Sequence, residues 1–281
     1  MKISIDTMNR LHRVQLEMLI ELIRVMDTLH LKYYFVHGSL LGAVRDHDFI
    51  AEDDDIDIAL LRNDYDKLFA RGNELINPEF FLQNSDNDEF PLAMGKMRKN
   101  HTAFIQPILK KCSCNKGIYI DIFPVDFHSD SLSFRAKNKL LRYRISEMMT
   151  SNSSIKRKIL MAFATAVYPT RKIALHSRER LYAGLHPSEY LSIYNGKPTE
   201  RKMPATWFAE TETCDFCGTE VLIPGSYKEY LERIYGKDFL NHNPAKDRID
   251  DHGEVEISAD ILDFDKSYRE YEKTLPDERR A

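Results

Sequence analysis

The first half of the chain combines stretches of helical apolar spacing with short apolar runs. Apolar residues recur at helical spacing over 6–31, which predicts an amphipathic helix with Asp6 or Thr7 as its cap. A turn at Gly38-Ser39 and a short helix over 39–45, with Ser39 as its N-cap, are expected next. Aromatic or alternating runs predict strands at 33–37, 55–61, 80–84, 94–99 and 117–126.

The second half begins with a helical and basic pattern. It covers 131 to about 184, and Pro169 is expected to divide it into two long helices. A further helix is predicted over 226–236, ending at Gly236, and the charged residues after 265 are expected to fray. Because strands and helices do not alternate strictly, the pattern predicts an α+β fold with a mixed sheet and flanking helices.

The charge distribution is uneven along the 281 residues. The net charge of −4 gives no global attraction to nucleic acid. Residues 131–180 nevertheless carry twelve Lys or Arg against only Glu147 and Glu179. One interpretation is a solvated helical face; the other is a surface that meets an anionic substrate or makes peripheral contact with a membrane.

The N-terminus lacks the apolar segment of a signal peptide, so a cytoplasmic location is expected, including the inner face of the membrane. Four cysteines do not suggest a disulfide framework. They favour buried thiols; the alternative is a four-thiolate zinc site. That site would consist of Cys112, Cys114, Cys214 and Cys217.

Two aspartates stand on one face of the second predicted strand. Asp55 and Asp57 are two residues apart, so their side chains project together, about 7 Å apart along the strand. Asp121 lies in another apolar strand, where an unpaired carboxylate would be costly to bury. A shared Mg²⁺ or Mn²⁺ would satisfy all three, although Asp121 could instead pair with a Lys or Arg. Asp126 is expected to be a turn or cap residue.

The Gly38-Ser39 turn precedes these acids. Glycine lets backbone approach a ligand closely, and the first N–H groups of a helix form an anion site. A phosphate chain on this turn, with its metal on Asp55 and Asp57, is the expected arrangement. Asp53 and Asp54 are expected to be loop groups or to lie behind the metal ligands.

Gly38-Ser39 followed by Asp55-x-Asp57 resembles the signature of the nucleotidyltransferase superfamily. The stretch "YYFVHGSLLGAVRDHDFIAEDDDIDIAL" is more closely similar to the LicD family of phosphocholine transferases. "KMRKNHTAF", "YIDIFPVD" and "VLIPGSYKEYLERIYGKDFLNHNPAKDRIDDH" resemble its later blocks. The likeness covers roughly 10–125 and 205–255. The family usually has Phe-Glu-Gly where this chain has "CDFCG", with Cys217 at the position of the glutamate.

The resemblance implies a nucleotidyltransferase fold with a helical insertion, and a specific reaction. CDP-choline or a similar CDP-alcohol would lose CMP, and phosphocholine would pass to a hydroxyl of a glycan or lipid-linked glycan precursor, as in lipopolysaccharide or teichoic acid modification. Asp55 and Asp57 would be metal ligands, and Asp121 the third ligand or general base. The phosphates would be held by Gly38, Ser39, Arg45, Lys96 and Arg98.

Substrate contacts are expected elsewhere in the chain. Arg248 and His252 are a candidate pair, four residues apart. Trp207 is the first candidate for an aromatic cage around a quaternary ammonium, since cation–π attraction would hold choline there. The weaker cage candidates are Tyr33, Tyr34, Tyr119 and Phe208.

Four segments are expected. They are a catalytic core over 1–130, a basic helical insertion over 131–204, a segment over 205–265 that completes the core, and a charged tail over 266–281.

Two other functions are compatible with the motifs: a nucleotidyltransferase that moves the nucleotide itself onto a hydroxyl, and a non-catalytic nucleotide or choline sensor.

Overall fold

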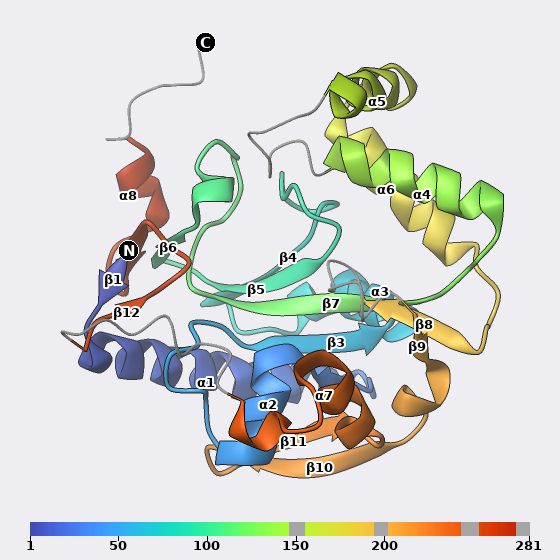
Figure 1. Cartoon of the computed structure of the whole chain (residues 1–281). Helices are drawn as coiled ribbons and strands as arrows, with labels where there is room; N and C mark the ends of the chain where they lie inside the picture. Colours follow the sequence, from blue (N-terminus) through green and yellow to red (C-terminus); the bar gives the residue numbers. More distant parts are fainter. Residues whose placement is uncertain (146–154, 194–201, 243–252, 274–281) are drawn as a thin grey trace.

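The computed structural model of the chain describes residues 1–145, 155–193, 202–242 and 253–273. Its centre is a mixed sheet in the order β2-β3-β7-β5-β4, extended by β8 and β9 (Figure 1). Strands β3 and β7 run parallel and the other pairs run antiparallel. The strands are β2 (Tyr34–Phe35), β3 (Asp57–Leu61), β4 (Phe80–Gln83), β5 (Gly95–Lys99), β7 (Tyr119–Phe127), β8 (Tyr190–Ile193) and β9 (Met203–Pro204). The α+β prediction is confirmed.

Helix α1 (Ile5–Thr28) covers one face of this sheet and contacts β5 and β7 (Figure 1). Its apolar stripe is fully buried, because positions three and four apart share a helix face. The cap is Ser4, whose side chain accepts the N–H of Thr7, rather than the expected Asp6 or Thr7. Helix α3 (Arg62–Arg71) contacts β3 and β7.

The pleat of the sheet separates apolar from polar side chains. Ile58, Ile122 and Met97 are buried and occupy register positions next to the polar ones. Neighbouring residues of a strand point to opposite faces, so the alternate positions form a second, polar face. The functional candidates lie on that second face.

Helix α2 (His37–Asp46) lies between β2 and β3 in the sequence. It begins two residues earlier than expected, with Val36 as its N-cap, so Ser39 lies inside the helix and does not cap it. Gly42 in this helix allows close packing: a Cβ there would stand 2.5 Å from the carbonyl oxygen of Asp48. The loop that leads to β3 therefore lies directly against the helix.

Three helices form a separate layer beyond the sheet, at the upper right of Figure 1. They are α4 (Leu132–Ile145), α5 (Ile155–Val167) and α6 (Arg171–Ala183). Helix α6 contacts β7, and α4 contacts both α5 and α6. The expectation of two long helices is wrong, because the described residues before Pro169 already form two separate helices.

The C-terminal part returns to the core. The hairpin β10 (Thr211–Phe216) and β11 (Thr219–Pro224) packs against α2 and β2, and α7 (Tyr227–Tyr235) contacts α2. Strand β12 (Val255–Glu256) pairs with β1 (Lys2–Ile3), and β13 (Ile261–Asp263) with β6 (Ala103–Ile105). The described part of the expected tail does not fray, since α8 (Tyr268–Glu272) has a capping box and buries Tyr268.

Within the described ranges, no helix combines the length and apolarity required to cross a bilayer.

Candidate active site

A row of four side chains crosses the polar face of the sheet. Asp57 on β3 is the register partner of Asp121 on β7, which is in turn the partner of Lys96 on β5. Lys96 is the partner of Gln83 on β4. Register partners point to the same face, so four segments distant in sequence contribute neighbouring polar groups.

Three carboxylates meet at one end of this row. Asp55, just before β3, joins Asp57 and Asp121, and one oxygen of each lies within 4.8 Å of the others. All three are half-buried. The structure thus brings together the three acids that the sequence predicted as a group. Within the described part of the chain, the other cluster of three acids is Asp53, Asp54 and Asp55.

The negative charges of Asp55, Asp57 and Asp121 lie close enough together to favour a bound cation. Burial, and then the charge of Asp57, raises the pKa of Asp55 well above its ordinary value. Burial also raises the pKa of Asp121, although the ammonium of Lys96 opposes this rise. Three converging carboxylates with one paired ammonium retain net negative charge. Oxygen donors in this number suit a hard divalent cation, so the residues fit the implied Mg²⁺ or Mn²⁺.

Lys96 forms a buried ion pair with Asp121. Its ammonium makes an ion pair with Oδ1 of Asp121 and lies 3.4 Å from the ring centroid of Tyr119. The side chain is 2% exposed, and burial lowers the pKa of its ammonium. The pairing of Asp121 with a lysine, which the sequence left open, is therefore present together with the carboxylate cluster. Lys96 positions Asp121 and leaves Oδ2 of this carboxylate for another partner.

Arg98 lies beneath the surface, two residues along the same strand face. It donates from Nε to Gln83 at 2.8 Å and from Nη1 to the carbonyl oxygen of Gly117 at 2.9 Å. Its Nη2 is buried and has no hydrogen-bond partner among the described residues. The structure thus links Arg98 to the loop that contains Gly117 and to β4, contacts that the sequence did not indicate.

The start of α2 supports Asp57. The backbone N–H of Asp57 donates to Oγ of Ser39 at 2.8 Å, and Nδ1 of His37 lies 3.4 Å from Oδ2 of Asp57. His37 has a left-handed φ of 51°, an uncommon conformation for a residue other than glycine. The sequence indicated only a packed histidine here; the unusual backbone conformation that aims it at Asp57 has no sequence signal.

Asp53 and Asp54 come directly before Asp55, and one oxygen of each lies within 4.8 Å of a carboxylate oxygen of Asp55. A Cβ on Gly38 would stand 2.2 Å from Oδ2 of Asp53, so this glycine makes room for a carboxylate of the chain itself. Asp54 is 1% exposed and accepts the N–H of Ser258 at 2.6 Å, which ties the C-terminal segment to the site. His12 and Gln15 of α1 contact the backbone carbonyls of Asp53 and Asp54.

Other expected site residues make contacts elsewhere. Arg45 donates to the carboxylate of Asp46 and to the carbonyl oxygen of His242. Trp207 lies against α7, with the guanidinium of Arg233 5.6 Å from its ring centroid. Arg248 and His252 lie outside the described residues.

The weaker cage candidates are mostly core residues. The hydroxyl of Tyr34 donates to the carbonyl oxygen of Phe208 at 2.6 Å. Tyr33 and Phe208 are buried as well. Tyr119 has a cation over its ring, but this cation is the ammonium of Lys96.

Asp126 was expected in a turn but is a buried residue of β7. It is 1% exposed and receives a two-point contact from Arg62, at 2.6 and 3.0 Å. The sequence pattern predicted the strand only as far as this residue, and the partner Arg62 comes from a distant helix, so local pattern could not show the pair.

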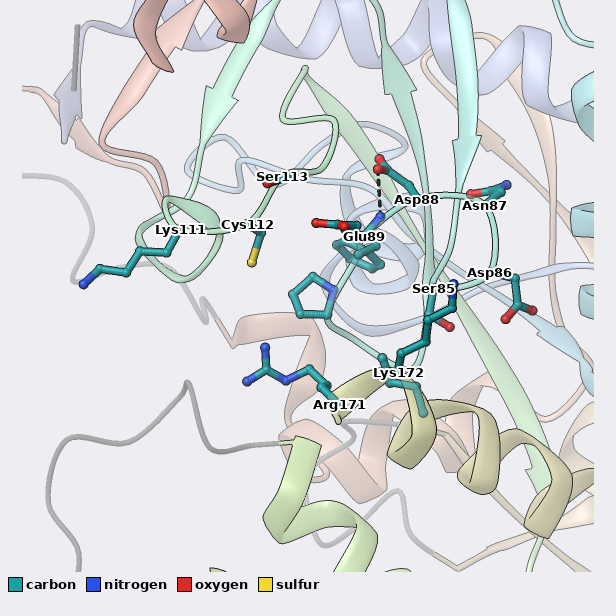
Figure 2. Close-up of a pocket in the computed structure, with 13 residues that line it drawn as sticks. Ser85, Asp86, Asn87, Asp88, Glu89, Lys111, Cys112, Ser113, Arg171 and Lys172 are labelled. Atoms are coloured by element: carbon teal, nitrogen blue, oxygen red, sulfur yellow. Dashed lines mark hydrogen bonds between the residues drawn. The ribbon is translucent and has the colours of Figure 1, made fainter. Parts of the chain in front are cut away.

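A hollow of about 610 Å³ lies beside the loop that follows β4. Figure 2 shows the residues that line it. The loop after β4, residues 111–113 and the start of α6 surround it. Asp88 lines the hollow and accepts the side-chain amide of Gln83 at 2.7 Å, which joins it to the row. None of the three clustered carboxylates lines it.

The four cysteines do not form the zinc site that was considered. The described clusters of potential ligands contain only aspartates. Cys112 and Cys114 contact each other, and the Cys114 thiol lowers the pKa of Cys112 to about 7. Cys217, at the position of the family's usual glutamate, lies in the turn between β10 and β11. Its thiol donates a hydrogen bond to the carboxylate of Asp48 at 2.9 Å.

Comparison with protein families identifies the class of protein that this fold and site define. Residues 30–179, more than half of the chain, match the family model described as "LicD/FKTN/FKRP, nucleotidyltransferase domain". The chain belongs to this family, which is one of transferases. The match includes α4 and α5, the basic region that the sequence separated from the core, and ends before the C-terminal block. A search of curated proteins found no match.

Proposed function

We propose that the protein transfers phosphocholine, or a related phospho-alcohol, from a CDP-linked donor to a hydroxyl of a cell-surface glycan precursor. The observation that supports this most directly is the convergence of Asp55, Asp57 and Asp121 within 4.8 Å on the polar face of the sheet. Membership of a transferase family with a nucleotidyltransferase domain supports the same reaction type.

In this proposal Asp55 and Asp57 hold Mg²⁺ or Mn²⁺, with Asp121 as a third ligand through the oxygen that Lys96 leaves available. The bound ion would supply neutralisation of the charge on the donor's phosphates. Ser39 and His37 fix the backbone and carboxylate of Asp57, so that this aspartate is oriented before the donor arrives.

The bond changes are those of an in-line displacement. The acceptor's hydroxyl oxygen bonds to the phosphorus that carries the alcohol, and the bond from that phosphorus to the bridging oxygen breaks. The bond's electron pair leaves with CMP. The hydroxyl proton passes to a carboxylate oxygen; Oδ2 of Asp121 is the candidate if this residue acts as base instead of ligand.

The test combines donors with matched variants. The protein is incubated with Mg²⁺, a glycan-containing lysate as acceptor, and CDP-choline, CDP-ethanolamine, CDP-glycerol or CDP-ribitol, and CMP is measured by chromatography. We expect one donor to give CMP, and Asp57→Asn or Asp121→Asn to lower the rate at least about a hundredfold. Asp265→Asn is the control, because its carboxylate is exposed and pairs with Arg10.

Two results would reject the proposal. The first is the absence of CMP from every donor. The second is unchanged turnover in a folded Asp57→Asn variant, with folding checked by circular dichroism. Release of pyrophosphate from a nucleoside triphosphate, with the nucleotide found on the acceptor, would instead support the nucleotidyl-transfer alternative.

A further inference from the structure

The outward face of α5 is apolar along its whole length. Its apolar side chains at every fourth position are exposed instead of buried: Ile155 is 78% exposed, Ile159 66%, Phe163 59% and Val167 45%. Residues four apart lie above one another on a helix, so these side chains form one continuous stripe. Single exposed apolar residues are ordinary on protein surfaces, but a stripe of four indicates an interaction surface.

The opposite face of α5 is the one that packs. Ala164 is fully buried, and α5 contacts α4. Helix α4 also contacts α6, and α6 contacts β7. Helix α5 is therefore connected to the sheet only through α4 and α6 in these contacts between described elements. Figure 1 shows α5 at the periphery of the molecule. The apolar stripe therefore faces away from the protein core.

The positive charge around this stripe indicates which kind of surface it would contact. Helices α4, α5 and α6 carry twelve Lys or Arg and a single acid, Glu179. Lys158 is exposed on α5, and Lys172 is exposed next to Ile173, itself 45% exposed, at the start of α6. A second copy of the chain would bring two strongly basic layers together, which is unfavourable. An anionic lipid surface complements both the charge and the apolar stripe.

We propose that the α5 face, defined as Ile155, Ile159, Phe163 and Val167, inserts into the interfacial region of a bilayer that contains anionic lipids. A helix of this kind lies in the plane of the interface and buries only its apolar side, while basic side chains around it contact the headgroups. The binding requires no turnover, so this inference and the proposed reaction can fail independently.

Vesicle flotation tests the inference. The full-length protein is mixed with vesicles of phosphatidylcholine alone or of phosphatidylcholine with phosphatidylglycerol. We expect it to float with the anionic vesicles and to remain behind with the neutral ones. Ile159→Glu/Phe163→Glu should reduce the bound fraction at least about tenfold, because two charges would enter the interface.

Ile20→Glu is the matched control, because Ile20 is 51% exposed on α1 and lies on a different helix. It should bind vesicles like the unaltered protein. Thermal unfolding should be nearly unchanged in all variants, since the replaced side chains are exposed. In addition, the tryptophan of Phe163→Trp should shift its emission to the blue with anionic vesicles.

Two outcomes would overturn the inference. One is that the unaltered protein does not float with anionic vesicles, or that the double glutamate variant floats equally well. The other is a dimer in light scattering that Ile159→Glu/Phe163→Glu dissociates, without any vesicle binding. That second result would show that another copy of the chain covers the α5 face.

Discussion

Asp57 is held from two directions at the scale of single residues. Its backbone is fixed by Ser39 and by pairing with β7, and its carboxylate lies beside the imidazole of His37. Both His37 and Ser39 belong to the start of α2. The short helix therefore supports the acid site mechanically, a contribution distinct from the phosphate contact expected of it.

The two glycines of α2 should respond differently to alanine. At Gly42 a Cβ would meet backbone, the carbonyl oxygen of Asp48, so the loop must move; we expect a loss of about 1–3 kcal/mol in the free energy of unfolding. At Gly38 it would meet the carboxylate of Asp53, which can rotate away, so the loss should be below about 1 kcal/mol. Urea denaturation of Gly42→Ala and Gly38→Ala measures both, and equal losses would contradict this reading of the packing.

At the scale of elements, one arginine joins three of them. Arg62, at the start of α3, contacts Asp126 of β7 and Glu179 of α6, with a distance of 2.5 Å to the latter. Burial raises the pKa of Glu179, while the guanidinium of Arg62 opposes the rise. This buried group fixes the basic helical layer to the sheet.

Removal of this arginine should destabilise the protein strongly. In Arg62→Met the buried carboxylate of Asp126 loses its two-point partner, and the remaining cation near it among the described residues is Arg178 at 3.8 Å. We therefore expect a loss of about 3–5 kcal/mol. Arg71→Met is the control, because the pair of Arg71 with Glu74 is exposed and should contribute about 0–1 kcal/mol. Similar urea midpoints for the two variants would show that the buried network is not stabilising.

The elements that the sequence predicted best are those with local signals. Helix α1 has a long stretch of apolar residues at helical spacing. Asp55 and Asp57 could be recognised because two acids stand two residues apart in a predicted strand. Asp121 could be grouped with them because a lone acid in an apolar strand requires a partner. By contrast, the pairs Lys96–Asp121 and Arg62–Asp126 join residues on different elements, so only the three-dimensional fold reveals them. The same holds for the short strands near the C-terminus, whose pairing partners lie far away in the chain.

At the scale of the whole molecule, stability should depend on the divalent cation. A ligand that binds only the folded state at about a hundredfold excess over its Kd adds about 2.7 kcal/mol, here roughly 5 °C in Tm. We expect Mg²⁺ to raise the Tm of the unaltered protein in scanning fluorimetry, and EDTA to reverse the effect.

Asp55→Asn/Asp57→Asn should lose this response. Without metal its Tm should equal or exceed that of the unaltered protein, because the substitutions remove mutual repulsion among the carboxylates. Asp265→Asn should respond to Mg²⁺ as the unaltered protein does. An undiminished Mg²⁺ response in the double variant would place the cation elsewhere.

The row of Asp57, Asp121, Lys96 and Gln83 determines where the chain tolerates insertions. Extra residues in the surface loops between its strands would leave the row intact. A single residue inserted within β5 would instead shift the pairing by one position and turn the ammonium of Lys96 toward the apolar face. The row therefore forms in only one pairing register of the strands. A scan of one-residue insertions should show activity lost for insertions inside strands and kept for insertions between them.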